Sequence, residues 1–68
     1  MNNREARKLA KSRFGTHPLW GFCYAEGSRT VGDFIATILK ADSDGDKAES
    51  AFWRDELATL VPLFRGDI

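Results

Sequence analysis

The sequence has very few of the residues that cross-link or metallate a small domain. Its 68 residues include one cysteine, Cys23, and one histidine, His17. A single cysteine excludes a disulfide framework within the chain, and one cysteine with one histidine cannot fill a structural zinc site. We therefore expect no metal and no cofactor, and the fold must be held by apolar packing or by a second subunit.

Long apolar runs and targeting signals are also lacking. The longest apolar stretch, residues 57–64, is interrupted by Thr59 and Pro62 and is far shorter than the roughly 20 residues that cross a bilayer. The apolar side of residues 1–13 is too small to favour insertion into a membrane surface. Because a lone cysteine also suits a reducing compartment, these features predict a cytoplasmic protein with no membrane association.

The sequence contains no recognisable catalytic constellation. A nucleophilic cysteine–histidine pair would need both Cys23 and His17, and Cys23 lies between two aromatic residues, where we expect a small buried hydrophobe. Asp55 and Glu56 are adjacent, so they point in different directions on a helix. Phosphate-binding glycine patterns and nucleophile elbows are absent from the sequence. We predict that the protein is not an enzyme.

An acidic run at Asp42, Asp44 and Asp46 has the alternate spacing of a calcium-binding loop. Counting from Asp42, Lys47 stands where that loop requires glycine, and Trp53 stands where it requires a bidentate glutamate. We therefore expect a solvated turn and a helix cap here, without a metal site.

Apolar residues recur at helical spacing along most of the chain and predict a single all-α domain over residues 1–68. The expected architecture is a small bundle of three to four short helices. Their approximate ranges are 3–13, 18–26, 31–41 and 47–61. In the last of these, Phe52, Leu57 and Leu60 contribute to a broad apolar face.

Capping residues mark the starts of the two C-terminal helices. Thr30 and Asp33 resemble a capping pair, and Asp46 with Glu49 forms a stronger one because glutamate reaches back better than aspartate.

The segment 18–26 is the most ambiguous part of the sequence. Thr16 and Pro18 are typical of a helix start, and Gly27 is typical of a helix end. The aromatic residues at 20, 22 and 24 also fit the alternation of a strand, which Gly21 would weaken. We favour a helix, because no other segment offers a strand for pairing.

The net charge of zero conceals a division of charge along the chain. Residues 1–13 carry five cationic residues and one carboxylate, hence +4, whereas residues 14–68 carry five cationic residues and nine carboxylates, hence −4. A basic helix ahead of an acidic body either folds back onto that body or faces another negatively charged partner.

Two groups of residues indicate a binding surface. Aromatic side chains exceed what one small core easily hides, and cationic side chains share one side of the first helix. We therefore predict a non-enzymatic interaction or regulatory protein. Its aromatic anchors would be Trp20, Tyr24 and Trp53, and the residues that steer an acidic partner would be Arg4, Lys8 and Lys11. An aromatic core cluster is an equally good interpretation, and both roles coexist in a homodimer.

Nucleic-acid binding is the alternative interpretation of the basic helix, since cationic side chains on one helix can follow phosphates. The residues concerned are Arg4, Arg7, Lys8, Lys11 and Arg13. No helix carries the side chains that typically read base edges. A homo-oligomer without any other partner is a third possibility.

Overall fold

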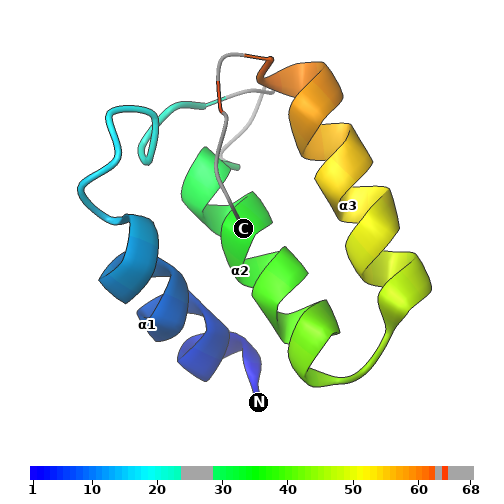
Figure 1. Ribbon diagram of the computed structural model, residues 1–68. Helices are drawn as coiled ribbons and strands as arrows, with labels where there is room; N and C mark the ends of the chain where they lie inside the picture. Colours follow the sequence, from blue (N-terminus) through cyan, green and yellow to red (C-terminus); the bar gives the residue numbers. More distant parts are fainter. Residues whose placement is uncertain (24–28, 63, 65–68) are drawn as a thin grey trace.

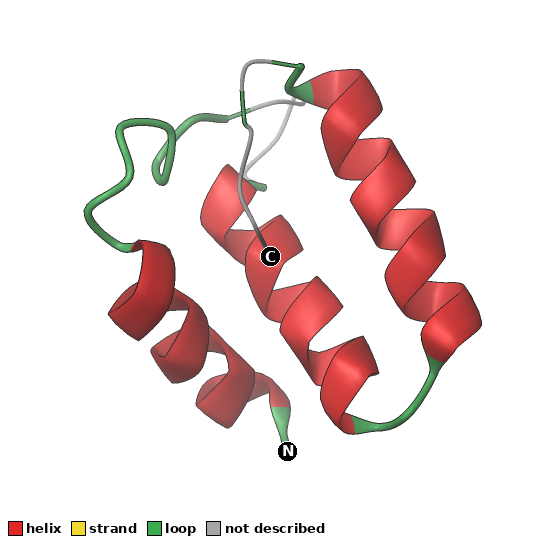
Figure 2. Ribbon diagram, viewed as in Figure 1, coloured by secondary structure: helices red, strands yellow, loops and turns green. Residues whose placement is uncertain are grey.

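Three helices lie side by side, with α2 between α1 and α3 (Figure 1). The computed structural model describes residues 1–23, 29–62 and 64. Its helices are α1 (Asn3–Phe14), α2 (Val31–Ser43) and α3 (Lys47–Leu60). Both α1 and α3 pack against α2 and make no contact with each other. The predicted all-α class is confirmed, and Figure 2 shows helices joined by loops throughout the described residues.

The central helix α2 supplies most of the core. Val31, Ile35 and Ile38 have no exposed surface, because α2 is covered on both flanks by its neighbours. Over residues 31–41 of α2, only a narrow side remains half-exposed, and it carries Asp33, Thr37 and Lys40. A helix that is buried around most of its circumference must be apolar around most of it, as α2 is.

The basic helix α1 packs through two alanines. Ala6 and Ala10 are buried against the core, and their small side chains let α1 lie close to α2. A capping box starts α1: Asn2 Oδ1 accepts from the Glu5 amide at 2.8 Å, and Glu5 Oε1 accepts from the Asn2 amide at 3.1 Å. The helix ends before Gly15, close to the predicted boundary.

A polar network fastens α3 to the end of α2. Asp42 accepts hydrogen bonds from the Ser50 hydroxyl and, at 2.7 Å, from the Arg54 guanidinium. The connecting turn uses Gly45 at φ 73°, a conformation that glycine adopts without strain. Val61 caps α3 and Pro62 follows it, so the predicted C-terminal boundary is confirmed.

The relative strength of the two predicted caps is wrong. Thr30 and Asp33 form a complete capping box at α2, whereas Asp46 at α3 only accepts from the Glu49 amide, at 3.1 Å. The Glu49 side chain is used elsewhere: its Oε1 accepts from Trp53 Nε1 at 2.8 Å, one helical turn further on. The Glu49 carboxylate thus bonds to Trp53 and does not reach back to the Asp46 amide.

The predicted helix over residues 18–26 is wrong for residues 18–23, and residues 24–26 lie outside the described part of the chain. Residues 16–21 form successive turns, and Cys23 makes an isolated antiparallel bridge with Thr30. The physical reason lies at the start of α2. The Trp20 and Phe22 carbonyls accept from the amides of Gly32 and Val31 at 3.1 and 3.0 Å, so they are engaged in capping α2.

The broad apolar face predicted for α3 is only partly correct. Leu57 is buried, but Phe52 and Leu60 are 54% and 45% exposed. The cause is the one-sided packing of α3, which contacts α2 alone among the helices. None of the helices in the described part of the chain has the length and apolar character needed to cross a bilayer.

Candidate interaction surface

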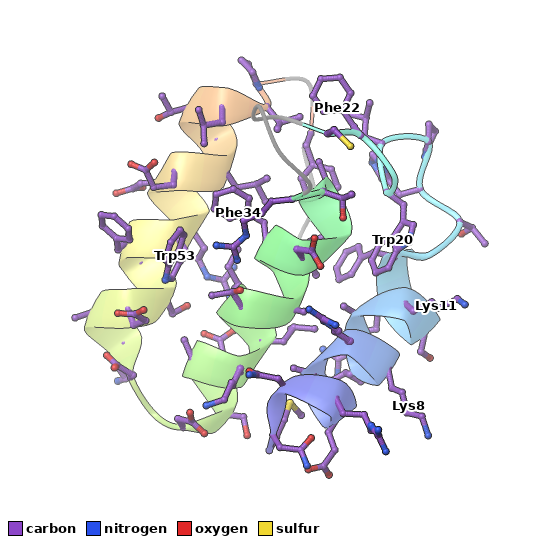
Figure 3. The ribbon with its side chains drawn as sticks, turned by 180° about the vertical axis from the view of Figure 1, so that it is seen from behind. Lys8, Lys11, Trp20, Phe22, Phe34 and Trp53 are labelled. Atoms are coloured by element: carbon purple, nitrogen blue, oxygen red, sulfur yellow. The ribbon has the colours of Figure 1, made fainter. Side chains whose placement is uncertain are left out.

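The outer face of α1 is a row of cationic side chains. Arg4, Lys8 and Lys11 follow one another at helical spacing and are all exposed, whereas Ala6 and Ala10 face the core. Figure 3 shows Lys8 and Lys11 extending from α1 away from α2. The predicted separation of α1 into a buried side and a basic side is therefore confirmed. We call Arg4, Lys8 and Lys11 the basic stripe.

The acidic body neutralises little of this charge. Arg7 lies 4.0 Å from Asp33 on α2, and its side chain is largely exposed, so this pair is weak. Within the described ranges, none of the basic-stripe residues forms an ion pair, and the same holds for Arg13. The basic helix thus rests on the body through its alanines while its charges face solvent.

A depression beside the basic stripe is lined in part by Trp20. It has a volume of about 250 Å³, and Arg7 and Lys11 of α1 line it together with Trp20 and the first turn of α2. The Trp20 ring is half-buried and packs on the core, beside Gly32. Figure 3 shows the ring between the end of α1 and the start of α2. The structure therefore brings together Trp20 and part of the predicted cationic set.

A second, more polar depression of about 370 Å³ continues along the groove between α1 and α2. Arg7 and Arg29 line it, and Asp33 lies in both depressions. One carboxylate thus stands among cationic side chains at the centre of this surface.

Trp53 does not line the depression that contains Trp20. It lies on α3, where its ring packs edge-on to Phe34 with a centroid separation of 5.4 Å. The Arg29 guanidinium lies 5.9 Å over the Trp53 ring, and Trp53 Nε1 donates to Glu49. Trp53 is therefore largely engaged within the molecule. The third predicted anchor, Tyr24, lies outside the described residues.

Among the described aromatic residues, the most exposed are two that were not predicted to be anchors. Phe22 is 47% exposed and Phe52 is 54% exposed. A helical wheel contains the signal for Phe52: it is five positions from buried Leu57 and hence about 140° from it around α3. No comparable sequence signal distinguishes Phe22 from Trp20, because their loop is not periodic.

The acidic run between α2 and α3 is used within the fold. Asp42 binds Ser50 and Arg54, and Asp46 caps α3. Lys40 Nζ donates to Asp44 at 2.7 Å, and this hydrogen bond holds the pKa of the Asp44 carboxyl below its ordinary value. Each of the three carboxylates thus has a different role at this corner of the molecule.

Cys23 and His17 also have separate surroundings. Cys23 is exposed, so the expectation of a buried thiol is wrong; residues 21–23 all lie on the surface. His17 Nδ1 accepts from the Leu19 amide at 3.0 Å, and the His17 ring packs against Phe64 with a centroid separation of 4.6 Å. His17 therefore stabilises the turn that follows α1.

Comparisons with family models, with curated proteins and with solved structures give no match to this chain. Its function is inferred from its own residues and geometry.

Proposed function

We propose that this protein is a non-enzymatic interaction protein that binds an acidic protein partner through α1. The observation that carries the proposal is the basic stripe, whose cationic side chains are exposed beside a body that leaves them without ion pairs in the described residues. Such unneutralised charge steers an oppositely charged partner and speeds association. The exposed Cys23 thiol is consistent with a cytoplasmic setting.

The depression at Trp20 supports a protein as the partner. Steering by charge alone gives little affinity, and a bound partner also needs an apolar contact that excludes water. Trp20 provides a half-buried ring directly beside Lys11 and Arg7. Asp33 also lies in this depression, where it would repel a phosphate but can accept hydrogen bonds from a peptide.

Nucleic acid is the second candidate, and the arrangement of charge supports it. The basic stripe is on α1, while Asp42, Asp44 and Asp46 lie at the turn between α2 and α3. A duplex could therefore approach α1 around Lys8 and Lys11, away from that acidic corner, which adjoins the start of α1, where the Met1 amino group lies 3.5 Å from the Ser43 hydroxyl. Neutralising about four phosphates predicts a log–log salt slope near −3.6.

Fluorescence anisotropy with two probes tests the proposal. One probe is a labelled glutamate- and leucine-rich peptide, and the other is a labelled random-sequence duplex, each titrated at low and at near-physiological salt. We expect the peptide to bind and Lys8→Glu/Lys11→Glu to weaken that binding by roughly tenfold or more. The matched control is Arg13→Glu, which reverses a charge on α1 outside the stripe and should change the affinity much less.

The duplex titration decides between the partner classes. Duplex binding that exceeds peptide binding, falls steeply with salt and is lost in both charge variants would make nucleic acid the partner. Failure of both probes to bind at low salt would refute a role for the basic stripe in binding either partner.

A further inference from the structure

The outer face of α3 has a charge pattern opposite to that of α1. Phe52 is 54% exposed there, and Glu49 and Glu56 lie three residues before it and four residues after it. Glu49 is exposed, with one carboxylate oxygen accepting from Trp53 Nε1, and Glu56 is half-buried. On a helix these spacings place all three side chains on one side. We call Glu49, Phe52 and Glu56 the acidic–aromatic stripe.

The two stripes match in spacing as well as in charge. Counted backwards from Lys11, the basic stripe continues after 3 and 7 residues, at Lys8 and Arg4. Counted forwards from Glu49, the acidic–aromatic stripe also continues after 3 and 7 residues, at Phe52 and Glu56. Both stripes therefore span about 10.5 Å along their helices. In an antiparallel arrangement, the pairs that face each other are Lys11 with Glu49, Lys8 with Phe52, and Arg4 with Glu56.

The chemistry of each facing pair is favourable. The terminal pairs join opposite charges, and the central pair sets a lysine against an aromatic ring, on which its stem and its ammonium group both make favourable contacts. The molecule already contains a contact between a cation and an aromatic ring on α3, where the Arg29 guanidinium lies 5.9 Å over the Trp53 ring. The Phe52 ring is next to it, 5.0 Å from the Trp53 ring, and is still exposed.

The two stripes cannot meet within one molecule. α1 and α3 lie on opposite sides of α2 and make no contact with each other (Figure 1). We propose that the acidic–aromatic stripe of one copy binds the basic stripe of a second copy, so that the protein associates with itself head to tail. This inference rests on the proposed function, because it makes a second copy one acidic partner of α1.

A contact between two helices of 12 and 14 residues is small. The helices are about 18 and 21 Å long, so the contact buries less than the roughly 1,600 Å² of a standard interface. We therefore expect weak, reversible association with a dissociation constant on the order of 0.1–1 mM. Because the two stripes are different surfaces, each added copy leaves one stripe open, and the assembly grows beyond a dimer.

Sedimentation velocity over a concentration series up to about 1 mM tests the inference. We expect the average mass of the wild type to rise with concentration. Raising the salt from 0.1 to 1 M, which shortens the Debye length from about 10 to about 3 Å, should weaken association by about tenfold or more.

Two stripe variants make the test specific. Arg4→Glu/Lys11→Glu alters only α1, and Phe52→Ala/Glu56→Lys alters only α3, so each should remain monomeric by itself. An equimolar mixture should form dimers and nothing larger, because only one intact pair of stripes remains. Arg13→Glu and Phe22→Ala are the controls, and both should associate like the wild type. Far-ultraviolet circular dichroism verifies that every variant is folded.

Three results would overturn the inference: a wild type that stays monomeric, a mixture that stays monomeric, or an α3 variant that associates like the wild type. Peptide binding by α1 is measured separately, so a monomeric wild type that still binds the acidic peptide would refute self-association alone. Absence of both would refute the proposed function as well.

Discussion

Replacing Gly32 by alanine tests the seating of Trp20 on α2. A methyl group at Gly32 would lie 2.9 to 3.1 Å from three atoms of the Trp20 ring, which is closer than nearly all contacts that side-chain carbons make. The ring is half-buried against the core, and the Trp20 carbonyl is tied to the Gly32 amide at 3.1 Å, so its retreat is restricted. The substitution therefore forces the loop to move.

Two opposing terms set the magnitude. Alanine stabilises a helix by about 0.5–1 kcal/mol relative to glycine, whereas overpacking costs about 1–3 kcal/mol. We expect Gly32→Ala to lower the free energy of unfolding by about 0.5–2 kcal/mol in the wild type. In a Trp20→Leu background, where the ring atoms over Gly32 are gone, the same change should raise it by about 0.5–1 kcal/mol.

The free energy of unfolding of the wild type, of each single variant and of the double variant Gly32→Ala/Trp20→Leu is measured by urea unfolding, followed by far-ultraviolet circular dichroism. With an m-value of about 1 kcal/mol per molar urea, the two expected effects move the midpoint in opposite directions by about 0.5 M or more. A coupling of about 1–3 kcal/mol supports the contact. If Gly32→Ala stabilised both backgrounds equally, Trp20 would not be seated on Gly32, and its place beside the basic stripe would be refuted.

Two further predictions concern the acidic corner. Asp42→Ala should lower the free energy of unfolding by about 0.5–1 kcal/mol, because Asp42 accepts from both the buried Ser50 hydroxyl and the Arg54 guanidinium, although its own side chain is about as exposed as that of Asp44. Asp44→Ala removes a single exposed pair with Lys40, so urea unfolding should show a smaller loss; equal losses would contradict a special role for Asp42. The pKa of Asp44, measured by NMR titration, should be below the ordinary aspartate value and should return to it in Lys40→Met, since the Lys40 hydrogen bond lowers it. A lowered Asp44 pKa stabilises the fold at pH values above the ordinary aspartate pKa, and this stabilisation is lost as the pH falls through the lowered pKa. If the Asp44 pKa were unchanged in Lys40→Met, the Lys40 hydrogen bond would not be the cause of the shift.

The outcome at α3 shows that the width of the buried face of a helix depends on how many neighbours the helix has. Leu57 and Phe52 are both apolar, and the sequence analysis placed both on one broad face. The structure buries Leu57 and exposes Phe52, because a helix with a single neighbour buries only one side. The number of neighbours that a helix has is a property of the assembled fold, and no local pattern states it.

Local patterns in the sequence predicted the three observed helices, with ends within two residues of the observed ones, and the basic stripe. The same kind of pattern also predicted a helix over residues 18–26, which does not form over residues 18–23. These patterns reflect interactions within about four residues: side chains that cap a helix, and apolar or charged residues that recur with its period. Such interactions are present in the sequence before any folding takes place.

The path of residues 16–23 and the exposure of the described aromatic rings could not be predicted from local patterns. Trp20 and Phe22 turn away from a helix because the first amides of α2, about ten residues later, need their carbonyls. Trp53 is held by Arg29 and Phe34, which lie far from it in the sequence. Local preference in these segments is weak, so contacts between distant residues determine their structure.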